Sequence, residues 1–176
     1  MSLQQTHITT ERLTITPLHV IDAEFMYELL TSQGWLQFIG NRNISNVQDA
    51  ERYIESLLGS QYAMCWAVRL QNKQTPIGIL TFLKRDELEY HDFGFAFLPH
   101  YQGCGYAFEA STAVTHQLLQ SGEYSTLLAI TVMQNNRSVA LLEKLGFTFL
   151  KENKKGNEIL WVYKLQNRNK AAGSIS

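Results

Sequence analysis

The spacing of hydrophobic positions along the chain changes between two periods, which predict strands and helices in turn. Near the N-terminus, Leu13 and Ile15 alternate with threonines, which is the period of a strand with one buried face. Apolar residues three and four positions apart follow Asp22 and Ser45, two residue types that cap helices, and Ser45 has a glutamine in the capping-box spacing. The pattern therefore predicts a first strand and then two amphipathic helices, the first of which ends before Gly34.

The remaining apolar stretches predict a meander, a crossover and a final hairpin. Short polar turns separate three strand-like stretches, Tyr62–Leu70, Ile77–Lys84 and Tyr90–Leu98, and such turns favour antiparallel pairing. After them come a helix from Tyr106 to Ser121, a strand Leu127–Val132, a helix Asn135–Lys144, and strands Phe147–Lys151 and Ile159–Leu165. We expect an α+β fold, with a mixed, mostly antiparallel twisted sheet of about seven strands and about four helices.

Length and composition favour a single globular unit. The chain has 176 residues, of which 45% are hydrophobic and 18% charged, so it has enough apolar side chains for a core. This length predicts one domain, residues 1–166, followed by a flexible polar tail, residues 167–176. The formal net charge of −1 and the lack of a basic block disfavour direct binding of nucleic acid.

The sequence shows neither a targeting segment nor a metal-binding motif. Its first residues lack the basic and apolar regions of a secretory signal, and no apolar run is long enough to cross a bilayer. Cys65 and Cys104 lie far apart, and the five histidines form no metal-binding spacing. We therefore expect a cytoplasmic protein that contacts no membrane and holds no metal.

The most informative segment is a glycine turn, residues 98–107, between an apolar strand and an amphipathic helix. Gly103 and Gly105 let backbone N–H groups approach a ligand, and the helix start adds free donors and a partial positive charge, which together suit a phosphate. A tight turn without a ligand explains the glycines as well. A Rossmann turn is disfavoured because Phe108 replaces its third small residue, and a P-loop because Gly-Lys-Ser/Thr is absent.

This turn resembles the coenzyme A loop of a known enzyme family. Gln102-x-x-Gly105-x-Ala107 is similar to the Q/R-x-x-G-x-G/A signature of the GNAT acetyltransferases, whose backbone amides hold the coenzyme A pyrophosphate. Three further segments resemble, in the same order, the RimJ/RimL-like branch of ribosomal-protein N-terminal acetyltransferases. They are residues 10–13 (TERL), 92–102 (DFGF, then LPHYQ) and 135–147 (NNRS through EKLGF). The resemblance implies the GNAT fold, acetyl-CoA as cosubstrate and an amine as acceptor.

By this resemblance, the coenzyme lies between the fourth strand, the glycine turn and the start of the last helix. The strand backbone is expected to hold the pantetheine arm, and the amides of the turn the pyrophosphate. The residues expected to bind the coenzyme are Phe95, Ala96, Phe97, Leu98, Gln102, Gly103, Cys104, Gly105, Tyr106, Ala107, Asn135 and Ser138. Direct transfer is expected rather than a covalent acetyl-cysteine, because Cys104 has no evident histidine and acid partner.

Transfer to an amine requires a base, because the attacking nitrogen must lose its proton. An α-amino group, with a pKa of about 8, demands less of this base than a lysine of about 10.4. The resemblance points to Asp92, acting directly or through water, although a solvated carboxylate at a strand end is an equal interpretation. Glu11, His91 and Glu109 are weaker candidates, and Glu109 fits a helix surface better.

The departing thiolate needs a proton donor. Many GNAT members have a tyrosine seven residues after the motif asparagine, where this chain has Leu142. Ser138 matches a serine that the RimJ/RimL-like branch places near the sulfur, and we expect it to donate the proton. Ser138 is also placed to cap the helix together with Asn135, and Tyr101 is either an alternative acid or an aromatic wall.

The sequence outlines the acceptor side without naming the acceptor. In the family, specificity comes from the first two helices and the last strand turn, here residues 22–44 and 151–158. Trp35, Phe38 and Ile39 form either a wall of the acceptor site or part of the core. We expect a monomer or homodimer that acetylates a protein N-terminal α-amine. The alternatives are a small-amine enzyme (polyamine, amino acid or aminoglycoside), a silent coenzyme A-binding sensor, and a nucleotide-binding oxidoreductase.

Overall fold

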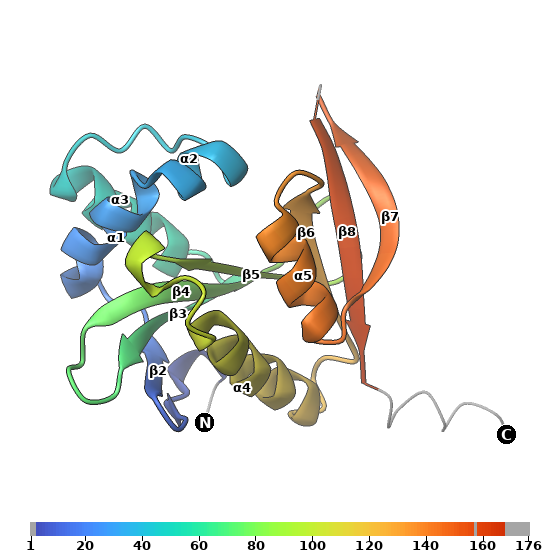
Figure 1. The fold of residues 1–176 in the computed structure, drawn as a ribbon, viewed down its shortest axis with the longest axis horizontal. Coiled ribbons are helices and arrows are strands. Elements are labelled where there is room, and N and C mark those ends of the chain that lie inside the picture. The colour runs from blue at the N-terminus through green and yellow to red at the C-terminus, as the bar shows by residue number, and fades with distance from the viewer. Residues whose placement is uncertain (1–2, 157, 168–176) are drawn as a thin grey trace, which may run out of the picture.

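The computed structural model describes residues 3–156 and 158–167, whose strands form one continuous sheet (Figure 1). The strand order is β1-β2-β3-β4-β5-β6-β8-β7, and each neighbouring pair is antiparallel except β5 and β6. The strands are β1 (Ile8–Thr9), β2 (Leu13–Pro17), β3 (Ala63–Leu70), β4 (Pro76–Leu83), β5 (Asp92–Phe97), β6 (Thr126–Val132), β7 (Thr148–Lys155) and β8 (Glu158–Gln166). This topology confirms the expected α+β fold, with its antiparallel meander and one parallel pair joined by a crossover helix.

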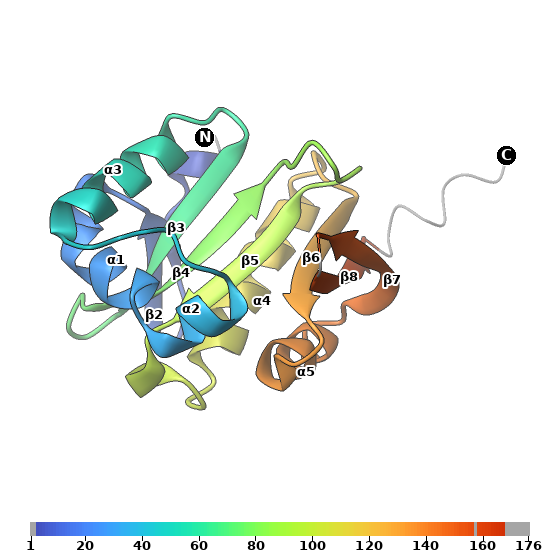
Figure 2. The ribbon, with the colours of Figure 1, turned by 90° about the horizontal axis from the view of Figure 1, so that it is seen from above.

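Helices cover both faces of the sheet (Figures 1 and 2). They are α1 (Ala23–Leu30), α2 (Gln33–Phe38), α3 (Val47–Leu58), α4 (Tyr106–Gln120) and α5 (Asn136–Lys144), with 3-10 turns η1 (Leu3–Gln5), η2 (Val20–Asp22) and η3 (Pro99–Tyr101). Because side chains alternate along a strand, β5 supplies two separate cores. Its Phe93 and Phe97 pack with α4 and α5, whereas Ala96 packs with α1 and α3.

Burial of apolar side chains attaches each helical layer to the sheet. Val114 and Leu118 of α4 are almost fully buried on one face, and Met26 of α1 and Ile54 of α3 are fully buried on the other. Each such side chain contributes about 1.5–3 kcal/mol relative to an exposed one. The helical spacing read from the sequence is therefore what fixes which side of each helix meets the sheet.

Two elements of the structure were not predicted. β1 has only two residues and exists by pairing with β2, in the register Ile8–Ile15 and Thr9–Thr14. α2 lies in the segment that the sequence treats as a break between two helices, and it begins where the Ser32 side chain accepts a hydrogen bond from the Trp35 N–H. Both elements are too short to produce a hydrophobic period.

The two predicted helix caps also differ from the observed ones. Asp22 occupies the N-cap position of α1 but makes no capping bond, because its carboxylate accepts from the His19 N–H and pairs with Arg69. α3 is capped by Asn46, one residue after the predicted Ser45, and the Asn46 side chain accepts from the Asp49 N–H. The sequence therefore placed the N-cap of α3 one residue too early.

Asn167, the first residue of the predicted tail, is hydrogen-bonded to the folded domain. Asn167 donates from its backbone N–H to Ser125 O and from its side chain to Leu119 O, so it is fixed to the end of α4 and the turn after it. The rest of the predicted tail, residues 168–176, lies outside the described residues. Within the described part of the chain, no helix has both the length and the apolar character needed to cross a membrane.

Candidate active site

The sheet opens between β5 and β6, the only parallel neighbours among the described strands (Figure 2). Their register contains a single pair, Asp92 with Leu128, at the very start of β5. β6 is fully paired on its other edge, where all of its residues from Thr126 to Val132 face β8. The two strands therefore diverge after Asp92 and leave the end of β5 without a partner on one edge.

Backbone alternation decides which groups of β5 face this gap. Leu98 donates its N–H to Ile77 of β4, and in an antiparallel pair every second residue bonds to the same neighbour. The backbone groups of Ala96 and Leu98 are therefore directed at β4, whereas those of Phe95 and Phe97 are directed at the gap. Of the four residues expected to hold pantetheine, Phe95 to Leu98, those whose backbone groups face the gap are Phe95 and Phe97.

The glycine turn follows β5 at the open end of this gap. Gly103 has φ +74° and Gly105 has φ +80°, and Gly105 is the N-cap of α4. The first backbone bond of α4 runs from the Glu109 N–H to Gly105 O, so the N–H groups at residues 106–108 precede the helical ladder. Residues 102–105 are exposed. The turn thus presents a row of N–H donors at a positive helix end, which suits a diphosphate.

Gln102 links this turn to the far side of the gap. Its Nε2 donates to Phe97 O over 2.9 Å, and its Oε1 accepts from Arg137 Nη1 over 2.9 Å. Because Arg137 is in the first turn of α5, the glycine turn and the start of α5 lie close together. The structure in this way unites three segments that the sequence places far apart, at residues 95–98, 102–107 and 135–138.

At the start of α5, Asn135 and Ser138 make different contributions. The Asn135 side chain accepts a hydrogen bond from the Ser138 N–H over 3.2 Å, so Asn135 is the helix cap. The bond uses the backbone of Ser138 and leaves its hydroxyl outside the cap. Leu142, at the position where many GNAT members have a tyrosine, is 1% exposed and belongs to the core beneath α4 and α5.

Asp92 lies where β5 and β6 begin to diverge, and it is only 4% exposed. Its Oδ2 accepts from Arg85 Nε over 2.6 Å. Burial raises the pKa of Asp92 above its usual value, and the charge and hydrogen bond of Arg85 offset this only in part. Asp92 is therefore a buried, paired acid and not a solvated carboxylate at a strand end.

The weaker base candidates have other surroundings. His91 stacks on Phe82, with ring centres 4.7 Å apart, and burial lowers its pKa. Glu11 is exposed. Glu109 forms an ion pair with Arg12, with 2.7 Å between the Arg12 Nε and the Glu109 Oε2, which corrects its interpretation as a free helix-surface residue. Sequence reasoning missed Arg12, although it stands in the TERL segment that carries part of the family resemblance.

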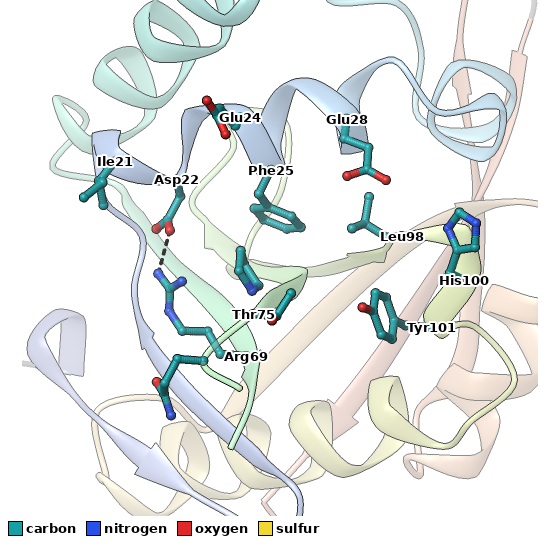
Figure 3. A pocket seen from close by; sticks show the side chains of 12 residues that line it. Ile21, Asp22, Glu24, Phe25, Glu28, Arg69, Thr75, Leu98, His100 and Tyr101 are labelled. Carbon is teal, nitrogen blue, oxygen red and sulfur yellow. Dashed lines mark hydrogen bonds and ion pairs between the residues drawn. The ribbon is translucent and has the colours of Figure 1, made fainter. Parts of the chain in front are cut away.

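A cavity of about 700 Å³ opens beside the end of β5, on the α1 face (Figure 3). Its lining includes Glu24 and Glu28 of α1, the Asp22–Arg69 ion pair, and Leu98, His100 and Tyr101. Neither Glu24 nor Glu28 forms an ion pair within the described chain. Tyr101 is half-buried and lines the cavity, as expected of an aromatic wall.

The three residues predicted to form the acceptor wall are not part of this cavity. Trp35 is 7% exposed and belongs to the core between α1, α3 and the sheet, so the core interpretation holds for it. Phe38 is half-buried, and Ile39 is 40% exposed at the end of α2. Among the described residues, no group of acidic, histidine or cysteine side chains is arranged to hold a metal ion.

Comparison with known proteins adds to this geometry. A family model described as an acetyltransferase (GNAT) domain matches residues 12–148. The uncharacterized N-acetyltransferase YnaD of Bacillus subtilis (strain 168) is 28% identical over 156 residues, which cover 86% of this chain and 91% of YnaD.

Two solved structures show the same fold. The ribosomal-protein-S5-alanine acetyltransferase of Vibrio fischeri has a TM-score of 0.78 at 16% identity, covering 93% of this chain and 98% of its own. The ribosomal L7/L12 alpha-N-protein acetyltransferase RimL, solved in complex with coenzyme A, has a TM-score of 0.80 at 15% identity, covering 92% and 98%.

Proposed function

We propose that this chain, which belongs to the GNAT family of acetyltransferases, moves the acetyl group of acetyl-CoA to the α-amino group of a protein N-terminus. The family makes the chain an N-acetyltransferase that depends on acetyl-CoA. The observation that carries the proposal is the gap between β5 and β6, which is open at the glycine turn. The names of its structural neighbours favour a protein N-terminus as the acceptor.

The residues at the gap fit coenzyme A. The turn offers N–H donors without intervening side chains at Gly103 and Gly105, where both residues have positive φ. The backbone groups of Phe95 and the N–H of Phe97 offer hydrogen bonds along the gap to a pantetheine arm, whereas Phe97 O already accepts from Gln102. When bound, acetyl-CoA supplies an activated thioester carbonyl, and the chain's own residues position it.

Asp92 is the proposed base, acting through water. It lies three residues before Phe95, about 10 Å along an extended strand, and one of its carboxylate oxygens is already bonded to Arg85. Direct contact with the amine is therefore disfavoured, and we assign the proton transfer to a chain of waters along the gap. The raised pKa of Asp92 supports this role, because a base with a pKa closer to the working pH holds the transferred proton better.

Ser138 is the proposed proton donor for the departing sulfur. Its hydroxyl lies outside the Asn135 cap, in the first turn of α5, and the contact between Arg137 and Gln102 brings this turn close to the coenzyme loop. Leu142 is a buried hydrocarbon side chain and cannot donate a proton, which is why the serine is assigned the role.

The acceptor is proposed to extend along α1 from the gap toward the open cavity. The unpaired Glu24 and Glu28 at this cavity favour an acceptor that carries positive charge besides the reacting amine. A small polyamine has the same property, so the acceptor class is decided by experiment.

Release of free thiol from acetyl-CoA tests the proposal when the full-length protein is offered a panel of acceptors. We expect turnover with peptides that have a free N-terminus and a basic residue nearby, no turnover with the same peptides after N-terminal blocking, and acetylation at the α-amine by mass spectrometry. Faster turnover with polyamines, amino acids or aminoglycosides would replace the protein N-terminus as acceptor. Tight coenzyme A binding without turnover on any amine would identify a silent sensor.

A further inference from the structure

Arg12 lies in the chain between β1 and β2, and its partly exposed side chain contacts the glycine turn and the first part of α4. Its Nε donates to Glu109 Oε2 over 2.7 Å, and its Nη1 donates to Cys104 O over 3.0 Å. The centre of its guanidinium group is 4.5 Å from the centre of the Tyr106 ring. A single side chain thus joins the loop, the helix start and the next turn of the helix.

Glu109 completes this contact from the helix side. Its Oε1 accepts from Thr10 Oγ1 over 2.6 Å and from the Arg12 N–H over 2.9 Å. Burial alone raises the pKa of Glu109, but the hydrogen bonds from Thr10 and Arg12 outweigh it, and the resulting pKa lies below its usual value. Glu109 is therefore charged at neutral pH and fixes the turn at residues 10–12 against α4.

The bond to Cys104 O has a geometric consequence for the neighbouring amide. The carbonyl of Cys104 and the N–H of Gly105 belong to one planar trans peptide unit, in which they point in opposite directions. Because the Cys104 carbonyl is directed at the Arg12 guanidinium, the Gly105 N–H is directed away from Arg12. The same side chain limits the space at Gly105, where an added Cβ would lie 3.3 Å from Arg12 Nη2.

We propose that Arg12 is a positioning residue for the coenzyme loop, acting together with Thr10 and Glu109 as one network, the Arg12 network. By holding Cys104 O and Glu109, Arg12 orients the 104–105 peptide unit so that its N–H is presented on the side opposite Arg12, as a donor for a diphosphate. The inference rests on the proposed function, because it assumes that this loop binds coenzyme A. Arg12 itself contacts none of the reacting atoms.

Arg12 could act on coenzyme binding by positioning the loop or by its positive charge, and the two roles predict opposite effects of substituting Glu109. If Arg12 served by attracting a diphosphate through its charge, removing the neighbouring carboxylate would free that charge and tighten coenzyme binding. If Arg12 serves by holding the loop, removing the carboxylate releases the guanidinium and weakens binding. Glu109→Gln distinguishes the two, since it keeps the size of the side chain and the positive charge of Arg12.

The test measures binding of coenzyme A to the full-length protein by calorimetry, together with KM for acetyl-CoA and kcat. We expect Arg12→Gln and Glu109→Gln each to raise Kd and KM about tenfold, and the double variant to be no weaker than either single one. At saturating acetyl-CoA, kcat should stay within about twofold of wild type. Arg12→Lys keeps the charge but not the planar fork of donors, so it should resemble Arg12→Gln.

Two further variants keep the test decisive. Arg52→Gln removes the exposed Arg52–Asp49 ion pair on α3 and should leave Kd unchanged. Thr10→Val removes one bond to Glu109, keeps both charges, and should weaken binding about two- to threefold even if Arg12→Gln does not fold.

Some outcomes would overturn the inference. The inference fails if Glu109→Gln binds coenzyme A as tightly as wild type or more tightly. It also fails if Arg52→Gln loses as much coenzyme affinity as Arg12→Gln. If the wild-type protein itself does not bind coenzyme A, the proposed function fails first, and the role given to the Arg12 network fails with it.

Discussion

The proposed coenzyme side and the proposed acceptor side of this protein are built by different means. The proposed coenzyme side uses mainly backbone groups in one stretch, from Phe95 to Ala107, where glycine conformation and strand alternation determine which donors are free. The proposed acceptor side uses side chains from several segments, because the cavity beside it is lined by Ile21, Asp22, Glu24, Phe25, Glu28, Arg69, Gln74, Thr75, Pro76, Leu98, His100 and Tyr101. A backbone site leaves a local sequence signature, whereas a side-chain site depends on contacts that form only in the folded chain.

Because the two proposed sides are built from different residues, substitutions on each side should affect different kinetic quantities. Changes at the glycine turn should alter coenzyme affinity and leave the use of acceptor intact, and changes near α1 should do the reverse. Substitutions at Asp92 and Ser138, the proposed base and proton donor, should alter turnover while leaving coenzyme affinity intact.

Asp92→Asn should have the largest effect, on kcat. General bases contribute about 10²–10⁴ in rate, so we expect kcat to fall at least about 100-fold while Kd for coenzyme A stays unchanged. Thiol release and calorimetry measure the two quantities. Asp86→Asn, in the exposed turn before β5, is the matched control and should be silent. Normal turnover in Asp92→Asn would leave Asp92 with only a structural role as the partner of Arg85.

The pKa of Asp92 gives this variant a second signature. Because burial raises the folded-state pKa, the folded protein binds this proton more tightly than the unfolded chain. The stability from the bound proton is fully present below the unfolded pKa of about 3.9 and is lost as pH rises through the folded pKa. Urea unfolding from pH 4 to 7 should therefore favour Asp92→Asn increasingly over wild type, and the opposite trend would contradict the raised pKa.

Gly105→Ala should affect the coenzyme side alone. The residue has φ +80°, where a side chain costs about 1–2 kcal/mol, and its new Cβ would lie 3.3 Å from Arg12 Nη2. We expect Kd for coenzyme A to rise about tenfold to thirtyfold with KM for the acceptor unchanged. Gly122→Ala, at φ +79° beyond the end of α4, carries the same backbone strain away from the loop. An equal loss of coenzyme affinity in Gly122→Ala would show that general destabilisation is responsible.

The sequence predicted those parts of the fold that repeat a local period. The meander, α3, α4 and α5 were all anticipated within a few residues, because their apolar positions recur along one face. β1 and α2 were missed because each is too short for a period, and each depends on neighbours in the fold. The N-cap of α3 was misplaced by one residue, since Ser45 and Asn46 are both good capping residues and only the folded backbone decides between them.

In the candidate site, too, features with a local sequence pattern were predicted and long-range contacts were not. The glycine turn was recognisable from residues 98–107, whereas the Arg12–Glu109 contact joins positions 97 residues apart and leaves no local signal. Trp35 was open to two interpretations because an aromatic residue near a helix end suits a core as well as a binding wall. Burial in the folded chain resolves it as a core residue.

Ser138→Ala should lower kcat by about tenfold and leave both coenzyme affinity and stability near wild type. The reason is that the α5 cap uses the Ser138 N–H, which alanine retains. Asn135→Ala is the informative contrast, because it removes the cap itself and should cost about 1 kcal/mol in urea unfolding. If Ser138→Ala weakens coenzyme binding and leaves kcat unchanged, the hydroxyl is a coenzyme contact and not the proton donor.

Glu24→Gln and Glu28→Gln should have the smallest effect, confined to the acceptor side. Both carboxylates are exposed at the cavity, where solvent and salt screen their attraction for a positively charged acceptor. The double variant should raise KM for a basic acceptor about two- to fivefold at low salt and less at high salt, with KM for acetyl-CoA unchanged. Glu55→Gln on α3 is exposed but lies outside the cavity lining, and it should change neither KM. If the double variant instead raises KM for acetyl-CoA, the cavity belongs to the coenzyme side, and the separation of the two sides does not hold.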